Sequence, residues 1–313
     1  NGTLTFNRSN AMTVANAISG SGSVVQAGTN TVTLTANNSY GTTTINSGAT
    51  LQIGNASTTG TLGSGAVTNN GTLTFNRSNA MTVANAIGGT GAVNQTGSGS
   101  TTFSVANTYT GLTTVSAGTL VVTHDSALGG TGTGTTVSGG TLDLQANIGS
   151  EPITLSGGAL QTTAGTGAIA GTITLGSHST ITVDGTLTLS GAIGGAYSLT
   201  KAGSGTLNLT GNNTYSGGST TINAGTVVVS GSGSLGASTN NLTLSGTASL
   251  DLQKSLTVAN LVLASGNTIT NSTGTSSLTV NGTSSLAGTI TTSGNQTYTG
   301  ATTLLANTSL VSN

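Results

Sequence analysis

One stretch of this chain occurs twice without a single change. Asn1 to Ile18 (NGTLTFNRSNAMTVANAI) returns at Asn70 to Ile87, an offset of 69 residues. Beyond it the two copies diverge but keep the order of their short motifs, so that Asn38-Ser39-Tyr40 corresponds to Asn107-Thr108-Tyr109. Such self-similarity is typical of repeat proteins, in which each unit buries its apolar face only by stacking on its neighbours. The duplication therefore restricts the chain to a repeat fold.

The segment Leu199 to Val229 (LTKAGSGTLNLTGNNTYSGGSTTINAGTVVV) indicates which repeat fold this is. Leu207 and Leu209 alternate with polar residues, and Val227 and Val229 resume the alternation after a bend. A period of two is that of a half-buried β-strand, and helix signals are nearly absent. With coils of ~20–25 residues, the sequence predicts an all-β fold, a parallel β-helix (β-solenoid) of ~13–15 coils.

We expect one continuous β-solenoid rather than separate domains, because no stretch is long enough to be a linker. Tyrosines that precede a glycine mark recurring corners at the unequal spacings of 69, 106 and 83 residues, which a solenoid tolerates by adding coils between them: Tyr40, Tyr109, Tyr215 and, in a weaker copy, Tyr298. The single domain spans residues 1–313, with repeat blocks at approximately 1–69, 70–174, 175–260 and 261–313. Because the chain starts without Met and in mid-strand, we expect a piece of a longer polypeptide or its mature part.

The composition excludes several classes of protein. Charged residues make up only 3% of the chain, against ~25% in ordinary domains. The 34% of apolar residues fall in regular alternation, which argues against disorder. The only cations are Arg8, Arg77, Lys201 and Lys254, too few for nucleic acid or an anionic membrane surface. Cysteine is absent, so disulfides and thiolate metal sites are excluded.

The same residues resemble a known family. Leu199 to Leu207, Asn213 to Gly218 and Ala224 to Val229 are similar to the autotransporter-associated β-strand repeat of Gram-negative passenger domains. Looser copies lie at Val24–Ile53 and Val93–Val122, and the tail Leu278–Leu310 resembles repeats of filamentous-haemagglutinin-type exoproteins. The resemblance, over about two thirds of the chain, implies a right-handed β-helix on the bacterial surface or released from it, whose repeats also aid export. Within the given sequence we expect neither a translocator barrel nor an N-terminal effector domain.

Candidate catalytic residues do not form a convincing site. Thr123-His124-Asp125-Ser126 has the residue types of a hydrolytic triad, but strand neighbours point to opposite faces, so an exposed turn is expected instead. His178 lacks a ligand partner at metal spacing and is expected at the surface. Gly130-x-Gly132-x-Gly134 lacks the lysine and helix of a nucleotide loop and is interpreted as a turn.

The carboxylates also lack the clustering of a catalytic or metal site. A glycosidase or lyase would need two or more acids at matching positions on stacked coils. Asp143, Asp184 and Asp251 are expected at outward strand positions, and Glu151 lies beside the only proline, at a corner. We therefore expect no catalytic, cofactor-binding or metal-binding residues and no cofactor. The full set of carboxylates is Asp125, Asp143, Glu151, Asp184 and Asp251.

The hypothesis that follows is a non-catalytic stalk or repeat region of a secreted or surface-displayed bacterial adhesin. Its coils would give extension, cohesion and export-coupled folding, with membrane contact only through a translocator not present in this chain. One alternative is a flat Thr-rich face that binds ice or a glycan, built from Thr-x-Thr pairs such as Thr31-Val32-Thr33 and Thr186-Leu187-Thr188. An aligned row of such pairs over five or more coils would favour binding. Other possible partners are a host or matrix receptor, and further copies of the chain joined end to end or side by side in a filament.

Overall fold

The computed structural model describes residues 2–305 and 307–313, so Asn1 of the duplicated stretch and Ala306 lie outside the described residues. Within this part of the chain all regular secondary structure is β-strand, and it contains no helix with the length and apolar character of a membrane span. The chain forms a β-solenoid of about 15 turns, which confirms the predicted fold class. It divides into two compact units, residues 1–154 and 155–313, and each is described by itself. Handedness and the continuity of one solenoid over the whole chain remain predictions.

The strands are short and follow one another at intervals of a few residues. Those of the N-terminal unit are β1 (Thr3–Phe6), β2 (Met12–Val14), β3 (Ser23–Gln26), β4 (Thr31–Leu34), β5 (Thr43–Ile45), β6 (Thr50–Ser57), β7 (Val67–Asn69), β8 (Thr72–Arg77), β9 (Met81–Val83), β10 (Ile87–Gly88), β11 (Ala92–Gln95), β12 (Ser100–Phe103), β13 (Thr113–Val115), β14 (Thr119–Val122), β15 (Thr135–Val137) and β16 (Thr141–Leu144), with β17 (Ile153–Leu155) at its boundary. Those of the C-terminal unit are β18 (Ala159–Thr162), β19 (Thr166–Ile169), β20 (Ile173–Leu175), β21 (Ser179–Val183), β22 (Thr186–Leu189), β23 (Ile193–Gly195), β24 (Leu199–Ala202), β25 (Thr206–Leu209), β26 (Ser219–Val229), β27 (Asn241–Leu252), β28 (Leu256–Val258), β29 (Leu261–Leu263), β30 (Thr268–Thr270), β31 (Leu278–Val280), β32 (Ser284–Leu286), β33 (Thr289–Thr292), β34 (Gln296–Tyr298), β35 (Thr302–Leu304) and β36 (Ser309–Ser312).

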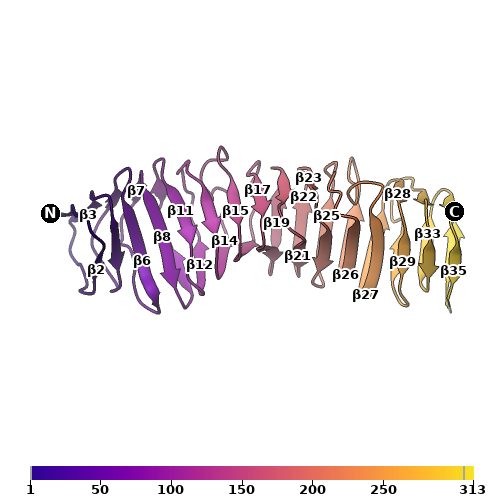
Figure 1. Ribbon diagram of the computed structural model, residues 1–313, viewed down its shortest axis with the longest axis horizontal. Coiled ribbons are helices and arrows are strands. Elements are labelled where there is room, and N and C mark those ends of the chain that lie inside the picture. Colours follow the sequence, from indigo (N-terminus) through magenta and orange to yellow (C-terminus); the bar gives the residue numbers. More distant parts are fainter. Residues whose placement is uncertain (1, 306) are drawn as a thin grey trace. The chain divides into compact units, whose positions relative to one another are not determined.

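In the N-terminal unit the strands pair in parallel with strands of adjacent coils. One sheet runs β1-β3-β5-β7-β10 and a second contains β2-β4-β6-β8-β11-β13-β15, while β9 starts a third that continues through β12, β14 and β16. Figure 1 shows these strands, in indigo to magenta, stacked one after another. Parallel pairing between coils satisfies the hydrogen-bonding groups of the strand backbones, so no helix is needed to do so.

The duplicated sequence occupies different faces of the N-terminal unit in its two copies. β1 belongs to the first sheet, whereas β8, which contains the same Thr-Leu-Thr-Phe sequence, belongs to the second. The reason is the coil length. Register partners in the first sheet are Thr3 and Ser23, and later Thr43 and Val67, so one coil takes about 20–24 residues. An offset of 69 residues therefore spans three coils and continues to the next face. Identical residues therefore meet different neighbours, and Arg8 is exposed while Arg77 is buried.

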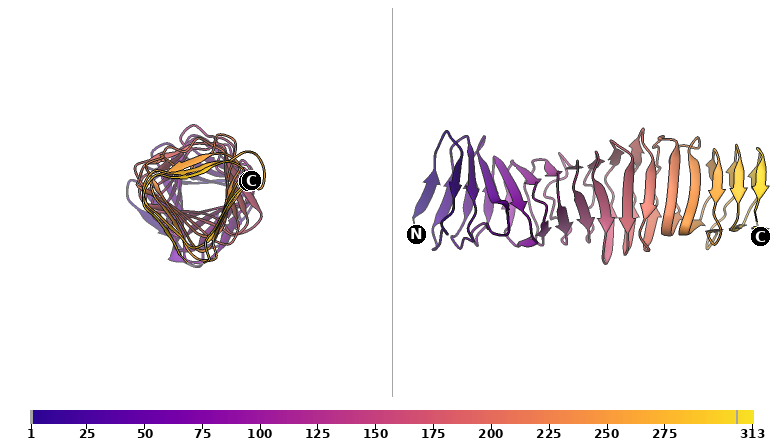
Figure 2. Two further views of the ribbon diagram at one scale, coloured as in Figure 1. Left: turned by 90° about the vertical axis from the view of Figure 1, so that its right-hand side faces the viewer. Right: turned by 60° about the horizontal axis from the view of Figure 1, so that its bottom comes forward.

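In the C-terminal unit the coils have three faces. One face stacks β19-β22-β25-β26-β27-β30-β33-β36, the second stacks β24-β26-β27-β29-β32-β35, and the third contains β28-β31-β34. The end-on view in Figure 2 shows the orange and yellow strands of this unit arranged as a triangle. β26 and β27 each serve two faces, with a register shift between Ile222 and Ala224.

The interior consists of aliphatic columns. Leu187, Leu207, Val227 and Leu250 are register partners on successive coils, and each is at most 1% exposed. Each such side chain contributes about 1.5–3 kcal/mol by leaving water. The predicted alternation of Leu207 and Leu209 with outward polar residues is confirmed. Ala11–Ile18, whose pattern also allowed a helix, contains strand β2.

Candidate functional site

Three Asn-Ser/Thr-Tyr corners have the same geometry and form the most distinctive local structure. At Asn213 the side-chain oxygen accepts the backbone N–H of Ile193, twenty residues earlier, at 2.9 Å. The side-chain nitrogen donates to the carbonyl of Ser234, on the following coil, at 2.7 Å. One amide thus joins three successive coils. The corresponding bonds of the other corners are Ile18 N–H to Asn38 (2.8 Å), Asn38 to Thr61 O (2.7 Å), Ile87 N–H to Asn107 (2.8 Å) and Asn107 to Ala127 O (2.6 Å).

The tyrosine of each corner fills the interior beside this amide. Tyr40, Tyr109 and Tyr215 are among the largest fully buried side chains. Each phenol hydroxyl is hydrogen-bonded to a threonine at the start of the next strand, as Tyr215 is to Thr220 at 2.7 Å. Burial raises the pKa of all three phenols. The tyrosines are therefore neutral side chains that pack in the interior.

A buried polar side chain closes the turn that precedes each corner. Lys201 Nζ donates to the carbonyls of Gly203 at 2.8 Å and Ala224 at 3.0 Å. Gln26 and Gln95 occupy the equivalent positions and donate to Gly28 and Gly97, two residues later. Burial lowers the pKa of Lys201 to about 8, although Asp184 partly opposes the effect. The lysine, which the sequence identified only as one of four cations, is an internal structural donor.

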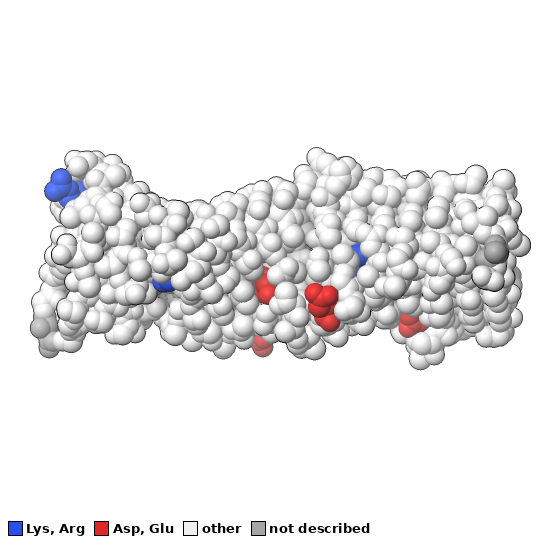
Figure 3. Space-filling model, turned by 90° about the horizontal axis from the view of Figure 1, so that it is seen from below, with Lys and Arg blue, Asp and Glu red and all other residues white. Residues whose placement is uncertain are grey.

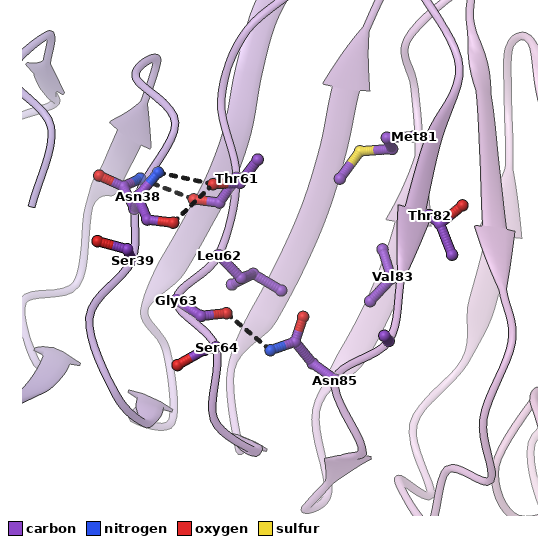
Figure 4. A pocket seen from close by; sticks show the side chains of 11 residues that line it. Asn38, Ser39, Thr61, Leu62, Gly63, Ser64, Met81, Thr82, Val83 and Asn85 are labelled. Carbon is purple, nitrogen blue, oxygen red and sulfur yellow. Dashed lines mark hydrogen bonds between the residues drawn. The ribbon is translucent and has the colours of Figure 1, made fainter. Parts of the chain in front are cut away.

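A groove of about 440 Å³ lies in the N-terminal unit between the first corner and strand β9 (Figure 4). Asn38, Leu62, Met81 and Asn85 line it, and none of the eleven lining residues is titratable. Asn85 donates to the Gly63 carbonyl at 2.9 Å, as the dashed line in Figure 4 shows. The groove therefore offers amides, hydroxyls and apolar surface.

The histidines and two of the aspartates lie at the surface, as predicted. Thr123–Ser126 is an exposed turn after β14, in which His124 Nδ1 accepts the N–H of Ser126. Asp184 is exposed. His178 is exposed and packs edge to face on Tyr197, with ring centroids 5.5 Å apart. Gly130–Gly134 lies in a turn region outside the strands.

Asp143 and Asp251 have the predicted outward register but not the exposure that it implied. Asp143 pairs with Val121 and Asp251 with Val228, yet their side chains are only 4% and 9% exposed. Glutamine two residues later covers each carboxylate, and Gln253 donates to Asp251 at 2.9 Å. Burial raises the pKa of Asp251, but hydrogen bonds from Ser272 and Gln253 outweigh it and hold the pKa below its usual value.

The histidines and acids of the described residues form no metal-binding cluster. No group of three His, Cys, Asp or Glu residues with metal-binding geometry occurs in residues 2–305 and 307–313. Figure 3 shows the charged side chains on the drawn face as isolated spots in an uncharged surface.

Glu151 is a carboxylate in the interior, a position that the sequence did not predict beyond a corner. It is 2% exposed. Thr135 Oγ1 donates to Oε1 at 2.8 Å, while Oε2 is buried without a hydrogen bond. Burial raises its pKa to about 7, against the opposing hydrogen bond of Thr135. Glu151 interacts electrostatically with Tyr109, whose pKa burial also raises.

The stability of the N-terminal unit is expected to depend on the protonation of Glu151. Between the usual value of 4.5 and the folded value of about 7, the folded state keeps the proton that the unfolded state has lost. Stability therefore falls as pH rises through this window and levels off above it, by about 3 kcal/mol at most. Denaturant titrations from pH 4 to 9 should show this decline in the wild type and not in Glu151→Gln. Asp125→Asn, a change at an exposed acid, should keep the decline; a wild-type profile identical to that of Glu151→Gln would contradict the assignment.

One surface array was missed by the sequence analysis. On one face of the C-terminal unit, hydroxyl residues are register partners along eight successive paired strands. The Thr-x-Thr pairs do not form a row of five or more coils: Thr268-x-Thr270 lies beside Thr289-x-Thr291, but two residues after Thr206 and Thr226 stand Asn208 and Val228. Aligning single Thr and Ser positions from coil to coil, rather than searching for Thr-x-Thr, would have found the array. This hydroxyl column consists of Thr166, Thr186, Thr206, Thr226, Ser249, Thr268, Thr289 and Ser309.

A family model described as Passenger-associated-transport-repeat matches three segments of the chain, residues 24–53, 93–122 and 199–229. Each segment contains one Asn-Ser/Thr-Tyr corner. Comparisons with curated proteins and with solved structures gave no match. The three matches and the parallel β-solenoid together support the passenger repeat of an autotransporter. The similarity of Leu278–Leu310 to filamentous-haemagglutinin repeats remains a prediction.

Proposed function

We propose that this chain is a non-catalytic stalk within the passenger of a secreted or surface-displayed bacterial adhesin. Its coils extend the molecule from the outer cell surface, hold together without charge and promote export by folding outside the cell. The observation that carries the proposal is the Asn-Ser/Thr-Tyr corner, which has one geometry in all three segments that match a transport repeat. A binding or catalytic region has no need to repeat a buried, neutral corner.

The composition supports the same role. Stacked coils place equivalent outward residues ~4.8 Å apart, and like charges at that spacing repel, whereas hydroxyls and amides hydrogen-bond to each other. Ser249 and Thr268, register partners on adjacent coils, are linked in this way at 3.0 Å. The low content of charged residues, 3%, thus favours the stability of a long stack of coils.

The export role is tested with the full-length parent protein in a Gram-negative cell. A triple variant, Tyr40→Ala, Tyr109→Ala and Tyr215→Ala, is compared with Tyr197→Ala, which changes an exposed tyrosine. We expect the triple variant to be synthesised normally but to reach the surface in several-fold smaller amounts, because its coils no longer fold stably outside. Equal surface amounts for the triple variant and Tyr197→Ala would contradict the export role.

A second candidate function, binding of a glycan or ice, is favoured by the hydroxyl column. Its eight members give a straight array of half-exposed or exposed hydroxyls. Replacing Thr206 and Thr226 by valine keeps the shape and removes two central hydroxyls. Loss of retention on insoluble polysaccharide, or of thermal hysteresis, in this variant would favour binding. No retention and no hysteresis in the wild type would exclude it.

A further inference from the structure

We propose that each Asn-Ser/Thr-Tyr corner is the centre of a three-coil clamp that opens and closes as one cooperative unit. The three clamps comprise residues 17–64, 86–130 and 192–237. Each clamp is longer than the transport-repeat match that it contains, because its contacts reach one coil before and one coil after that match. The inference rests on the proposed role in export and assigns the folding steps of that role to three defined places.

The first set of contacts attaches the corner to the preceding coil. Ile193 is central: its N–H is accepted by the Asn213 side chain, and its carbonyl accepts the backbone N–H groups of Thr214 and Tyr215 at 2.8 and 3.2 Å. Ile87 makes the same three bonds in the second clamp, with Asn107, Thr108 and Tyr109. The isoleucines precede the matched segments, which begin at 93 and 199 in these two cases.

The second set attaches the corner to the following coil. The Tyr215 carbonyl accepts the N–H of Ala237 at 2.9 Å. Gly236 lies against the tyrosine ring, where an added Cβ would be 2.8 Å from Cε2. The other clamps repeat the arrangement: Ser64 and Gly130 donate to the carbonyls of Tyr40 and Tyr109. A Leu-Gly pair stands at this point in every clamp and follows the end of the match.

These contacts give the clamp its own sequence signature. It reads Ala-Ile-x-Gly, then Asn-Ser/Thr-Tyr twenty residues after the isoleucine, then Leu-Gly on the next coil. The weak fourth copy lacks it. Gln296 stands where the asparagine would be, its neighbour Asn295 is exposed, and Tyr298 is only half-buried. The three complete signatures are Ala17–Gly20, Asn38–Tyr40 and Leu62-Gly63; Ala86–Gly89, Asn107–Tyr109 and Leu128-Gly129; and Ala192–Gly195, Asn213–Tyr215 and Leu235-Gly236.

Asparagine suits this position because its side chain both accepts and donates. Asn213 is 3% exposed, so each bond that it loses leaves a buried polar group without a partner. Aspartate has the same shape and can still accept from Ile193, but it cannot donate to Ser234 and places a charge against that carbonyl. The substitution therefore removes the side-chain bond to the following coil while retaining the side-chain bond to the preceding one.

Native-state hydrogen exchange of the full chain, followed by mass spectrometry, tests the clamp. We expect Asn213→Asp to accelerate exchange at least tenfold throughout residues 192–237, the Ile193 side included, while the clamps at 17–64 and 86–130 keep their wild-type rates. The matched control is Asn212→Asp, a change at the neighbouring exposed asparagine, which should leave all rates unchanged. Acceleration confined to the Ser234 side, spread evenly over residues 155–313, or equal in the two variants would overturn the proposal.

The wild type supplies a second readout should Asn213→Asp fail to fold. In increasing denaturant the amides of each clamp should be the last of their unit to exchange and should share one rate. Earlier exchange of a clamp than of its neighbouring coils would overturn the proposal. Surface export of the same variant separates this inference from the proposed function. Faster exchange combined with normal export would support the clamp and contradict the export role. Unchanged exchange would contradict the clamp, whatever the amount exported.

Discussion

Replacing Tyr215 by alanine should lower the free energy of unfolding of the C-terminal unit by about 3–5 kcal/mol. The ring is fully buried, and its loss leaves a cavity that the surrounding backbone cannot fill. The hydroxyl network is lost with it, since Thr220 bonds both to Tyr215 at 2.7 Å and to the Leu235 carbonyl at 3.0 Å. Urea titration followed by far-ultraviolet circular dichroism measures the change.

Tyr197→Ala in the same unit is the control. Its side chain is 37% exposed and contacts the ring of His178 at the surface. We expect a loss below about 1 kcal/mol, as is usual for surface substitutions. A loss for Tyr215→Ala no larger than that for Tyr197→Ala would mean that the corner is not a main source of stability.

The second large effect is expected at a glycine. In Gly191→Ala the new Cβ would lie 1.9 Å from the carbonyl oxygen of Gly171, on the preceding coil. The obstacle is backbone and cannot turn aside, so two coils must separate locally. We expect a loss of about 3 kcal/mol or more, at the upper end of overpacking effects, in the same urea titration.

Gly194→Ala, three residues further on, is the matched substitution. Its Cβ would meet only Thr214 Oγ1, at an ordinary 3.6 Å, and its backbone is not in the left-handed region. The cost should be below about 1 kcal/mol. Comparable losses at the two glycines would show that close coil-to-coil approach at Gly191 does not limit side-chain size.

The sequence was most informative where the alternation of residues decides burial. Leu207, Leu209, Val227 and Val229 are inside as predicted, because a strand of period two has only one way to hide its aliphatic side chains. The tyrosine corners were also recognisable as markers, since they recur with a following glycine. Their mutual equivalence, and hence the candidate site, was accessible from sequence.

The features that the sequence did not predict depend on which coils are neighbours in the stack. The buried state of Lys201 and Glu151 follows from neighbours about twenty residues away, such as Ala224 and Thr135. Asp251 points outward as predicted, but Ser272 of the next coil covers it. Because coil lengths vary, the residue that pairs with a given position on the next coil cannot be found by adding a fixed number of residues. For the same reason the identical stretches beginning at Thr3 and Thr72 fall on different faces.

Crosslinking between neighbouring coils is the most direct test of this account, whose central claim is that parallel coils stack in the stated register. Thr186 is the register partner of Thr206, and Thr226 lies one coil beyond. The chain has no cysteine of its own, and paired parallel strands bring Cα atoms within the ~4.4–6.8 Å that a disulfide spans. Under mild oxidation we expect Thr186→Cys with Thr206→Cys to form an intramolecular disulfide and Thr186→Cys with Thr226→Cys to remain reduced; equal crosslinking of the two pairs, or none in the first, would contradict the stacking.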